Sequence, residues 1–202
     1  MPVWSTNYYK IVSRFNETIR AQFFGHVHSD QFQLFYNYDE LEQAKNDPHF
    51  NVELEPVNIA YLAPSLTTFI GVNPSYRVYE IDAETHELVD HYTYVMDLKK
   101  ANQQSAVNPS YEPVFDLLYS ARKEFNIPDL KATSWHNVVR NLYLNLDQLN
   151  QFIWLSRGTA DSKTTRDAIC ENGGACALNK ICELLSGKSY DDKLCNTVMR
   201  LL

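Results

Sequence analysis

The sequence has no apolar run near the ~18 to 20 residues that a membrane-spanning helix needs. Its first ten residues, MPVWSTNYYK, lack the basic, apolar and small-residue order of a signal peptide. Lys and Arg are not clustered, and the formal net charge is -7, which would repel a phosphate backbone, so nucleic acid is excluded as a partner. The 202 residues do contain 45% apolar residues, enough for a buried core, and this composition predicts a soluble globular protein.

Cysteine is scarce and confined to the carboxyl-terminal end. The four cysteines are Cys170, Cys176, Cys182 and Cys195. An even, clustered set indicates an oxidising compartment. One sequon, Asn16-Glu17-Thr18, makes Asn16 a predicted glycosylation site, whereas proline blocks the Asn-Pro-Ser triplets. The cysteines and the sequon indicate export, although the first residues do not resemble a signal peptide. These two observations agree if Met1 is an internal start in a longer coding sequence.

The residue pattern over 1–99 predicts a segment that contains a β-sheet. Apolar residues at helical spacing predict a helix over 8–19. Runs rich in Tyr, Phe, Val and Ile predict strands at 22–24, 31–37, 58–65, 76–82 and 88–98. The stretches between these runs carry turn-forming Pro, Asn or Asp.

The residue pattern over 100–202 predicts a helical segment. Together, the two segments predict an α/β (α+β) fold class for the chain. The expected helices cover 112–125, 134–146, 148–156, 163–170, 175–186 and 190–200. Ser134 and Asp147 are placed to cap two of them. We expect the domain boundary between residues 99 and 100.

His26 and His28 follow an apolar run and a glycine in AQFFGHVHSD. On a strand, residues i and i+2 project from the same face, so both rings would point together at the carboxyl end of the strand, where ligands of α/β folds collect. Imidazole suits Zn, Fe, Mn or Co. The alternative is two histidines that meet by chance on an exposed strand.

Further metal ligands are hard to find in the chain. His49 has D-x-H spacing with Asp47 but no strand before it, and His91 should face away from its neighbour Asp90. Asp30 could support a histidine ring by a hydrogen bond, or start a turn, and the turn is favoured. The histidine pair therefore has too few neighbours for a complete site, since zinc takes about four ligands.

Three aromatic residues, Trp135, Phe152 and Trp154, could insert into a lipid bilayer. This would be a peripheral membrane contact. Aromatic residues at helical spacing are more often part of a core, so the core is the favoured interpretation.

Three stretches carry a family resemblance: WSTNYYKIVSRFNETIRAQFFGHVHSDQFQLFY, AYLAPSLTTFIGVNPSYRVYEIDAETHELVDHYTYVMDLKKAN and YSARKEFNIPDLKATSWHNVV. In this order they resemble the carboxyl-terminal part of the acid sphingomyelinases, within the metallophosphatase superfamily. The resemblance covers nearly the whole chain, and FFGHxHxDxF together with APSxTTxIGxNPxYRVY is a specific combination.

The resemblance implies the carboxyl-terminal half of a metallophosphatase β-sandwich with flanking helices, followed by a helical disulfide-stapled subdomain. It implies a two-zinc enzyme, lysosomal or secreted, that hydrolyses sphingomyelin to ceramide and phosphocholine. The G-H-x-H histidines of the family each bind one zinc, which carries over to His26 and His28. The tyrosine of N-P-x-Y-R lies near the substrate headgroup, which carries over to Tyr76.

The cysteine spacing is similar to that of the family's terminal subdomain and implies the disulfides Cys170–Cys176 and Cys182–Cys195. Metallophosphatases also carry D-x-H, G-D-x-x-D, G-N-H and another histidine upstream of G-H-x-H. No glycine of this chain is followed by Asp or Asn, so the G-D and G-N motifs are absent. We therefore expect a site that needs the missing amino-terminal half, without which the AQFF strand would be an unpaired, aggregation-prone edge.

Two alternatives stay open. The chain could be a non-catalytic lipid- or protein-binding module that has lost the metal centre. It could also be a mononuclear metal binder that takes further ligands from a partner chain.

Overall fold

The computed structural model describes residues 2–160, 170, 174–188 and 191–201. Its strands are β1 (Gln22–Phe24), β2 (Gln31–Tyr36), β3 (Pro56–Leu62), β4 (Ser75–Ile81), β5 (Leu88–Val95) and β6 (Asp116–Ser120). Its helices are α1 (Pro2–Arg14), α2 (Tyr38–Asn46), α3 (Leu98–Val107), α4 (Ala121–Glu124), α5 (Ala132–Leu144), α6 (Leu146–Ser156), α8 (Gly174–Leu185) and α9 (Asp192–Leu201). This mixture of helices and sheets confirms the predicted α/β (α+β) class.

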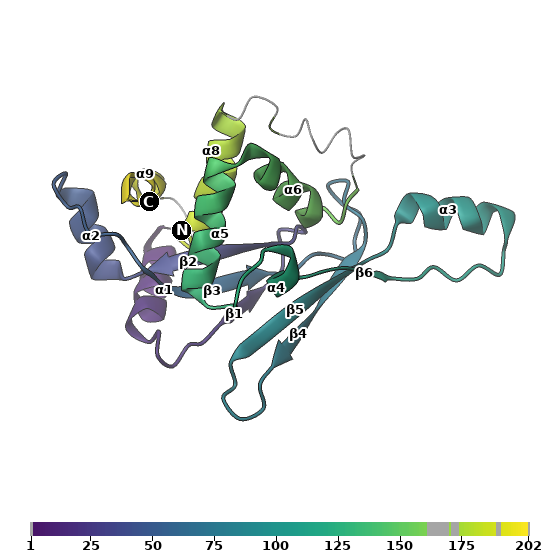
Figure 1. Cartoon of the computed structure of the whole chain (residues 1–202), viewed down its shortest axis with the longest axis horizontal. Helices are drawn as coiled ribbons and strands as arrows, with labels where there is room; N and C mark the ends of the chain where they lie inside the picture. Colours follow the sequence, from purple (N-terminus) through teal and green to yellow (C-terminus); the bar gives the residue numbers. More distant parts are fainter. Residues whose placement is uncertain (1, 161–169, 171–173, 189–190, 202) are drawn as a thin grey trace.

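The first sheet, sheet A, has the strand order β1-β3-β2, with β1 parallel and β2 antiparallel to β3. Successive residues of a strand face opposite ways, and β2 uses both faces. Phe32 contacts Trp135 of α5, whereas the ring of Phe35 lies 5.0 Å from that of Tyr9 in α1. Helices thus pack on both faces of sheet A, which explains why β2 and β3 are almost wholly buried (Figure 1).

The second sheet, sheet B, has the antiparallel order β4-β5-β6. The predicted helix over 112–125 is wrong in its first part, because residues 116–120 form strand β6 and only 121–124 are helical. Tyr119 is buried and pairs with Thr93 of β5. The expected boundary at residues 99 and 100 therefore does not separate the sheets from the helices, since sheet B takes strands from both sides of it.

Aromatic rings join the two sheets. Tyr61 of sheet A lies 6.1 Å from Tyr79 and 5.8 Å from His91, both of sheet B. His91 in turn stacks on Trp135 of α5 at 6.0 Å with the planes 3° apart. The Trp135 indole N–H donates to the Tyr61 hydroxyl at 2.9 Å, which satisfies one polar group of this buried interface.

The favoured interpretation of Trp135, Phe152 and Trp154 as core residues is confirmed, and the alternative of membrane contact through them is wrong. Trp135 is 1% exposed and Phe152 is buried, while Trp154 packs against the same core. Within the described residues, no helix combines the length and the apolar character that crossing a bilayer requires. These aromatic residues belong to the core, as the helical spacing favoured.

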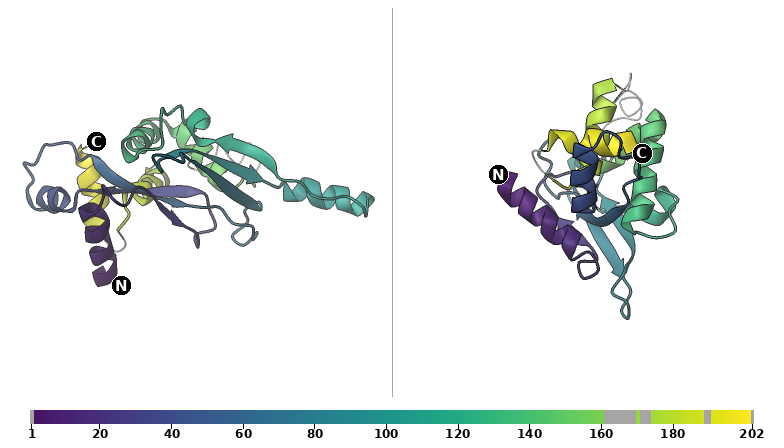
Figure 2. Two further views of the ribbon diagram at one scale, coloured as in Figure 1. Left: turned by 90° about the horizontal axis from the view of Figure 1, so that it is seen from below. Right: turned by 90° about the vertical axis from the view of Figure 1, so that its left-hand side faces the viewer.

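Two helices were not predicted. Helix α2 buries two residues, Leu41 and Ala44, and α3 buries one, Ala101. Because so few residues face a core, neither helix shows the apolar periodicity by which a helix is recognised in a sequence. Their signals lie instead at their starts, where the side chains of Asn37 and Asp97 accept backbone N–H groups of the first turn. Figure 2 shows α3 projecting away from the rest of the molecule.

The helices expected at 134–146, 148–156, 175–186 and 190–200 correspond to α5, α6, α8 and α9. The expected caps differ, because Asn145 rather than Asp147 accepts the N–H of Gln148, and Ser134 donates its hydroxyl to Asp129 at 2.6 Å. The helix expected at 163–170 lies outside the described residues, except for Cys170. The structure joins Cys170 to Cys176 and Cys182 to Cys195, the two pairs implied by the family resemblance.

His91 makes the stability of this fold depend on pH. Burial first, and then the nearby charge of Arg77, lower the pKa of His91 to about 2. An unfolded histidine titrates near pH ~6.5, so at lower pH the unfolded chain binds a proton that the folded chain does not. The stability that depends on neutral His91 is therefore present above pH ~6.5 and is lost as the pH falls towards 2.

We expect the free energy of unfolding of the wild type, measured with urea, to fall by about 2 kcal/mol more between pH 7 and pH 5 than that of His91→Phe. A His49→Phe control, at an exposed loop position, should keep the wild-type dependence. Equal losses in the wild type and in His91→Phe would contradict this role of His91.

Candidate metal centre

His26 and His28 lie in the loop that follows β1, not on a strand as expected. Strand β1 ends at Phe24, and both histidines have left-handed backbone, with φ of 81° and 61°. Positive φ is uncommon outside glycine, and residues held in such conformations cluster at functional sites. The loop thus turns at the histidines themselves, and alternation along a strand does not set the direction of their rings.

The two imidazoles have ring nitrogens available for a ligand. Within the described part of the chain, neither ring makes a hydrogen bond, and His26 is exposed while His28 is half-buried. Val27 packs against the core between them. The His28 ring meets the ring of Phe69 edge-on, with centroids 5.8 Å apart. Two imidazoles on a fixed loop are suitable metal donors.

Asp30 anchors the end of this loop. Its N–H donates to the carbonyl of Ser156 at 2.9 Å, and its buried carboxylate accepts hydrogen bonds from Thr93 at 2.8 Å and Tyr119 at 2.6 Å. The same carboxylate pairs with Arg77, whose side chain is 2% exposed. The favoured interpretation of Asp30 as a turn former is wrong, because its carboxylate is committed to residues of sheet B.

Arg77 is the other half of this anchor, and the sequence analysis missed it. Its guanidinium also contacts the hydroxyl of Tyr119 at 3.2 Å. A buried charge without a partner costs several kcal/mol, so each ion requires the other. A charged residue at an inward-facing strand position, as in YRVYEID, was the available signal, because such a residue needs an acidic partner.

Two further segments meet the histidine loop. The loop over 63–74 brings Phe69 against His28, and the Arg157 guanidinium donates to the carbonyl of Gly71 at 3.2 Å. Asn73 donates its side-chain amide to the carbonyl of Gly158 at 2.9 Å. Gly158 has φ of 59°, and a Cβ there would lie 2.6 Å from the Ser75 hydroxyl, so only glycine fits.

Tyr76 lies on the other face of sheet B from Arg77, as neighbouring strand residues do. Its ring stacks on Tyr94 at 5.1 Å and meets Phe115 edge-on at 5.2 Å. Arg77 points towards Asp30, so the structure does not bring Tyr76 together with the histidine pair. Its expected contact with a substrate headgroup stays a prediction.

The described residues do not bring together a complete set of metal ligands. No group of three or more His, Cys, Asp or Glu that could bind a metal is found among them. Burial lowers the pKa of His91 and of His136, and both are core residues, while His49 and His86 are exposed elsewhere. His26 and His28 fit zinc by their chemistry, but they supply fewer than the about four ligands of a typical zinc site.

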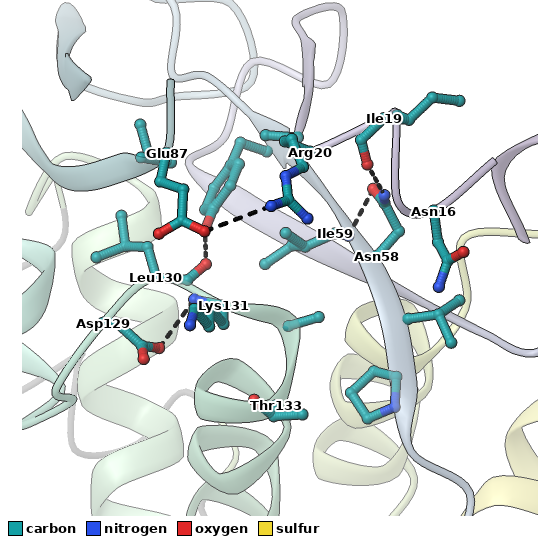
Figure 3. Close-up of a pocket in the computed structure, with 16 residues that line it drawn as sticks. Asn16, Ile19, Arg20, Asn58, Ile59, Glu87, Asp129, Leu130, Lys131 and Thr133 are labelled. Atoms are coloured by element: carbon teal, nitrogen blue, oxygen red, sulfur yellow. Dashed lines mark hydrogen bonds and ion pairs between the residues drawn. The ribbon is translucent and has the colours of Figure 1, made fainter. Parts of the chain in front are cut away.

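A separate pocket of about 370 Å³ lies where β1 and β3 begin (Figure 3). The histidines instead follow the end of β1. Arg20 and Glu87 form an ion pair across it at 3.6 Å. Asn16, the sequon asparagine, is half-buried and lines this pocket in the turn after α1.

Comparisons with known proteins match this chain to one family. The family described as acid sphingomyelin phosphodiesterase C-terminal region matches residues 55–200. A sphingomyelin phosphodiesterase of Homo sapiens is 37% identical over 202 residues, which cover 97% of this chain and 28% of the relative. Sphingomyelin phosphodiesterase 1 of Caenorhabditis elegans is 34% identical over 96% of this chain and 30% of its own length. The acid sphingomyelinase-like phosphodiesterase 3b of Homo sapiens is 27% identical over 88% of this chain and 36% of its own length.

The Asp30–Arg77 pair should show strong energetic coupling. Removing either partner leaves the other charge buried and unpaired, so Asp30→Ala and Arg77→Ala should each lower the free energy of unfolding by about 3 to 5 kcal/mol. The double variant should lose much less than the sum, because no orphaned charge remains. Urea denaturation of the four proteins gives this cycle.

The exposed Arg20–Glu87 pair is the control for this cycle, with an expected coupling below about 1 kcal/mol. Additive losses at Asp30 and Arg77 would contradict the anchoring role of the pair.

Proposed function

The chain belongs to the acid sphingomyelin phosphodiesterase family, as its carboxyl-terminal region, and from this premise we propose that it forms part of a zinc-dependent phosphodiesterase that hydrolyses sphingomyelin to ceramide and phosphocholine. The first two relatives named above are sphingomyelin phosphodiesterases, and the chain spans 28% and 30% of their lengths. The activity proposed is that of the whole protein.

The observation that carries this proposal is the geometry of the G-H-x-H loop. His26 and His28 have left-handed backbone, their ring nitrogens are available, and Asp30 fixes the end of the loop through a buried ion pair. A loop held in place before the ligand arrives avoids the entropy cost of ordering it. This is what a metal-binding loop requires.

In the proposed site, His26 and His28 would each hold one of two zinc ions through a ring nitrogen. Zinc at such a site lowers the pKa of a bound water and offsets the charge of the phosphodiester. The residues of this chain would contribute the position of the two imidazoles, through Asp30 and Arg77, and a wall beside His28, through Phe69.

The remaining ligands would come from the region of the protein that precedes this one in the relatives. Support comes from the surface it would cover: β1 is an edge of sheet A, and its Phe23 and Phe24 are about half exposed. Helix α1 beside it exposes Trp4, and Phe15 is exposed directly after the helix ends. An edge strand with apolar side chains is a template for pairing, so we propose that upstream strands continue sheet A there.

The proposed compartment is lysosomal or extracellular. Both disulfides support it, because disulfides persist in oxidising environments. Asn16 would carry a glycan there, since its sequon lies in a turn at the surface of the chain.

Loss of either ligand should abolish the activity. In the complete gene product, we expect His26→Ala and His28→Ala to lower sphingomyelin hydrolysis by more than the ~10- to 100-fold that loss of an outer-shell partner costs, with a matching loss of zinc. His49→Ala, an exposed histidine in another loop, serves as the control and should remain active. Unchanged turnover with full zinc content in either variant would contradict the ligand assignment.

The 202-residue chain alone should bind no stoichiometric zinc by elemental analysis and should not hydrolyse sphingomyelin, because it supplies too few ligands. Hydrolysis by the purified chain would contradict the proposed division of the site. The competing function is a non-catalytic lipid- or protein-binding module, favoured by the same incomplete ligand set. A complete gene product that binds sphingomyelin vesicles but lacks zinc and activity would support that module.

A further inference from the structure

The loop over 65–71 exposes three large apolar side chains beside the candidate metal centre. Leu66 is 64% exposed, Phe69 69% and Ile70 49%. We call these three residues the apolar tip. Single exposed apolar residues are normal on a protein surface, but three within five positions of one loop form a local apolar patch.

Hydrogen bonds hold this loop in a defined shape. Within the loop, the Ser65 hydroxyl accepts the N–H of Thr67 at 3.1 Å, and the Thr68 carbonyl accepts that of Gly71 at 2.9 Å. The Ser65 carbonyl accepts the N–H of Ser75 at 2.9 Å, which ties the start of the loop to β4. Exposure of the apolar tip is therefore a property of an ordered loop.

We propose that the apolar tip inserts into the surface of a lipid bilayer and so brings the histidine pair to the substrate. This proposal rests on the proposed function, which makes a membrane lipid the substrate. The apolar side chains of the tip would move from water to the boundary between lipid headgroups and acyl chains. This transfer is favourable because it removes apolar surface from water.

The depth of insertion agrees with the position of the site. Apolar side chains that bind at an interface reach about 5 to 10 Å into the boundary of headgroups and acyl chains. The Phe69 ring lies 5.8 Å from that of His28, so insertion of the tip places the histidines at the level of the lipid phosphates. A site for a phosphodiester bond of a membrane lipid needs this position.

Positive charge lies next to the same loop. Helix α3 begins beside it, because the N–H of Leu98 donates to the side-chain oxygen of Asn73 at 3.3 Å, and Thr68, Gly71 and Lys99 line one pocket. Lys99 and Lys100 are both exposed. The chain has a net charge of -7, so these lysines supply local attraction to anionic lipid headgroups where the rest of the chain would repel them.

A bilayer suits the apolar tip better than another part of the protein does. Strand β1 is an edge of sheet A and the proposed surface for upstream strands, whereas the tip is a loop between β3 and β4. The tip offers no unpaired strand for a protein to extend. Leu144, 80% exposed as the last residue of α5, is an exposed leucine outside this loop and provides a matched comparison.

The test is binding of the complete gene product to vesicles of phosphatidylcholine, sphingomyelin and phosphatidylserine, measured by cosedimentation. We expect Leu66→Ser to weaken binding about tenfold, which corresponds to losing most of the burial of one leucine side chain. The control Leu144→Ser should bind like the wild type. In Leu66→Trp, the tryptophan emission should shift to shorter wavelength when vesicles are added.

Wild-type binding by Leu66→Ser, or an unshifted emission of Leu66→Trp, would overturn the proposal. A lower thermal midpoint of Leu66→Ser with unchanged vesicle binding would also overturn it, and would assign the tip to a contact within the protein. Vesicle binding is measured without turnover, so absence of sphingomyelin hydrolysis by the wild type would contradict the proposed function alone.

Discussion

The ion pair between Asp30 and Arg77 is the constraint on which the candidate site depends. Asp30 ends the loop that carries His26 and His28, and Arg77 comes from the inner face of sheet B. Both ions are removed from water, so neither can leave the other without a large cost. Thr93 and Tyr119 fill the remaining positions on the carboxylate. The histidine loop, the three strands of sheet B and the end of α6 are thereby fixed together, although they are far apart in the sequence.

This arrangement sets the backbone conformation of the loop that carries His26 and His28. A loop whose backbone is left-handed at two positions is strained, and it persists because the surrounding contacts determine it. Its histidine rings make no hydrogen bond among the described residues, and the loop over 63–74 adds an aromatic wall beside His28 and an ordered apolar tip. Metal binding and membrane contact would then act at one end of the molecule, while the free edge of β1 remains for the upstream region of the protein.

Much of this could be read from the sequence, for physical reasons that differ between elements. The strands β2 to β5 and helices α5, α6 and α8 were predicted because their apolar periodicity reflects their burial. Strand β6 was mistaken for a helix since Leu117, Leu118 and Ala121 also fit helical spacing. The helix α3 was missed because it buries little. The histidine pair was found by its spacing, but its left-handed backbone and its anchor through Arg77 depend on contacts distant in sequence, which local patterns do not encode.

The central claim is that His26 and His28 are ligands of two metal ions in the complete protein. Anomalous X-ray scattering at the zinc edge from crystals of that protein tests it most directly. The account predicts two zinc peaks, with a ring nitrogen of His26 at about 2.0 to 2.1 Å from one and a ring nitrogen of His28 at the same distance from the other. Zinc peaks that lie away from both histidines, or an ordered histidine loop with no peak beside it, would contradict the claim.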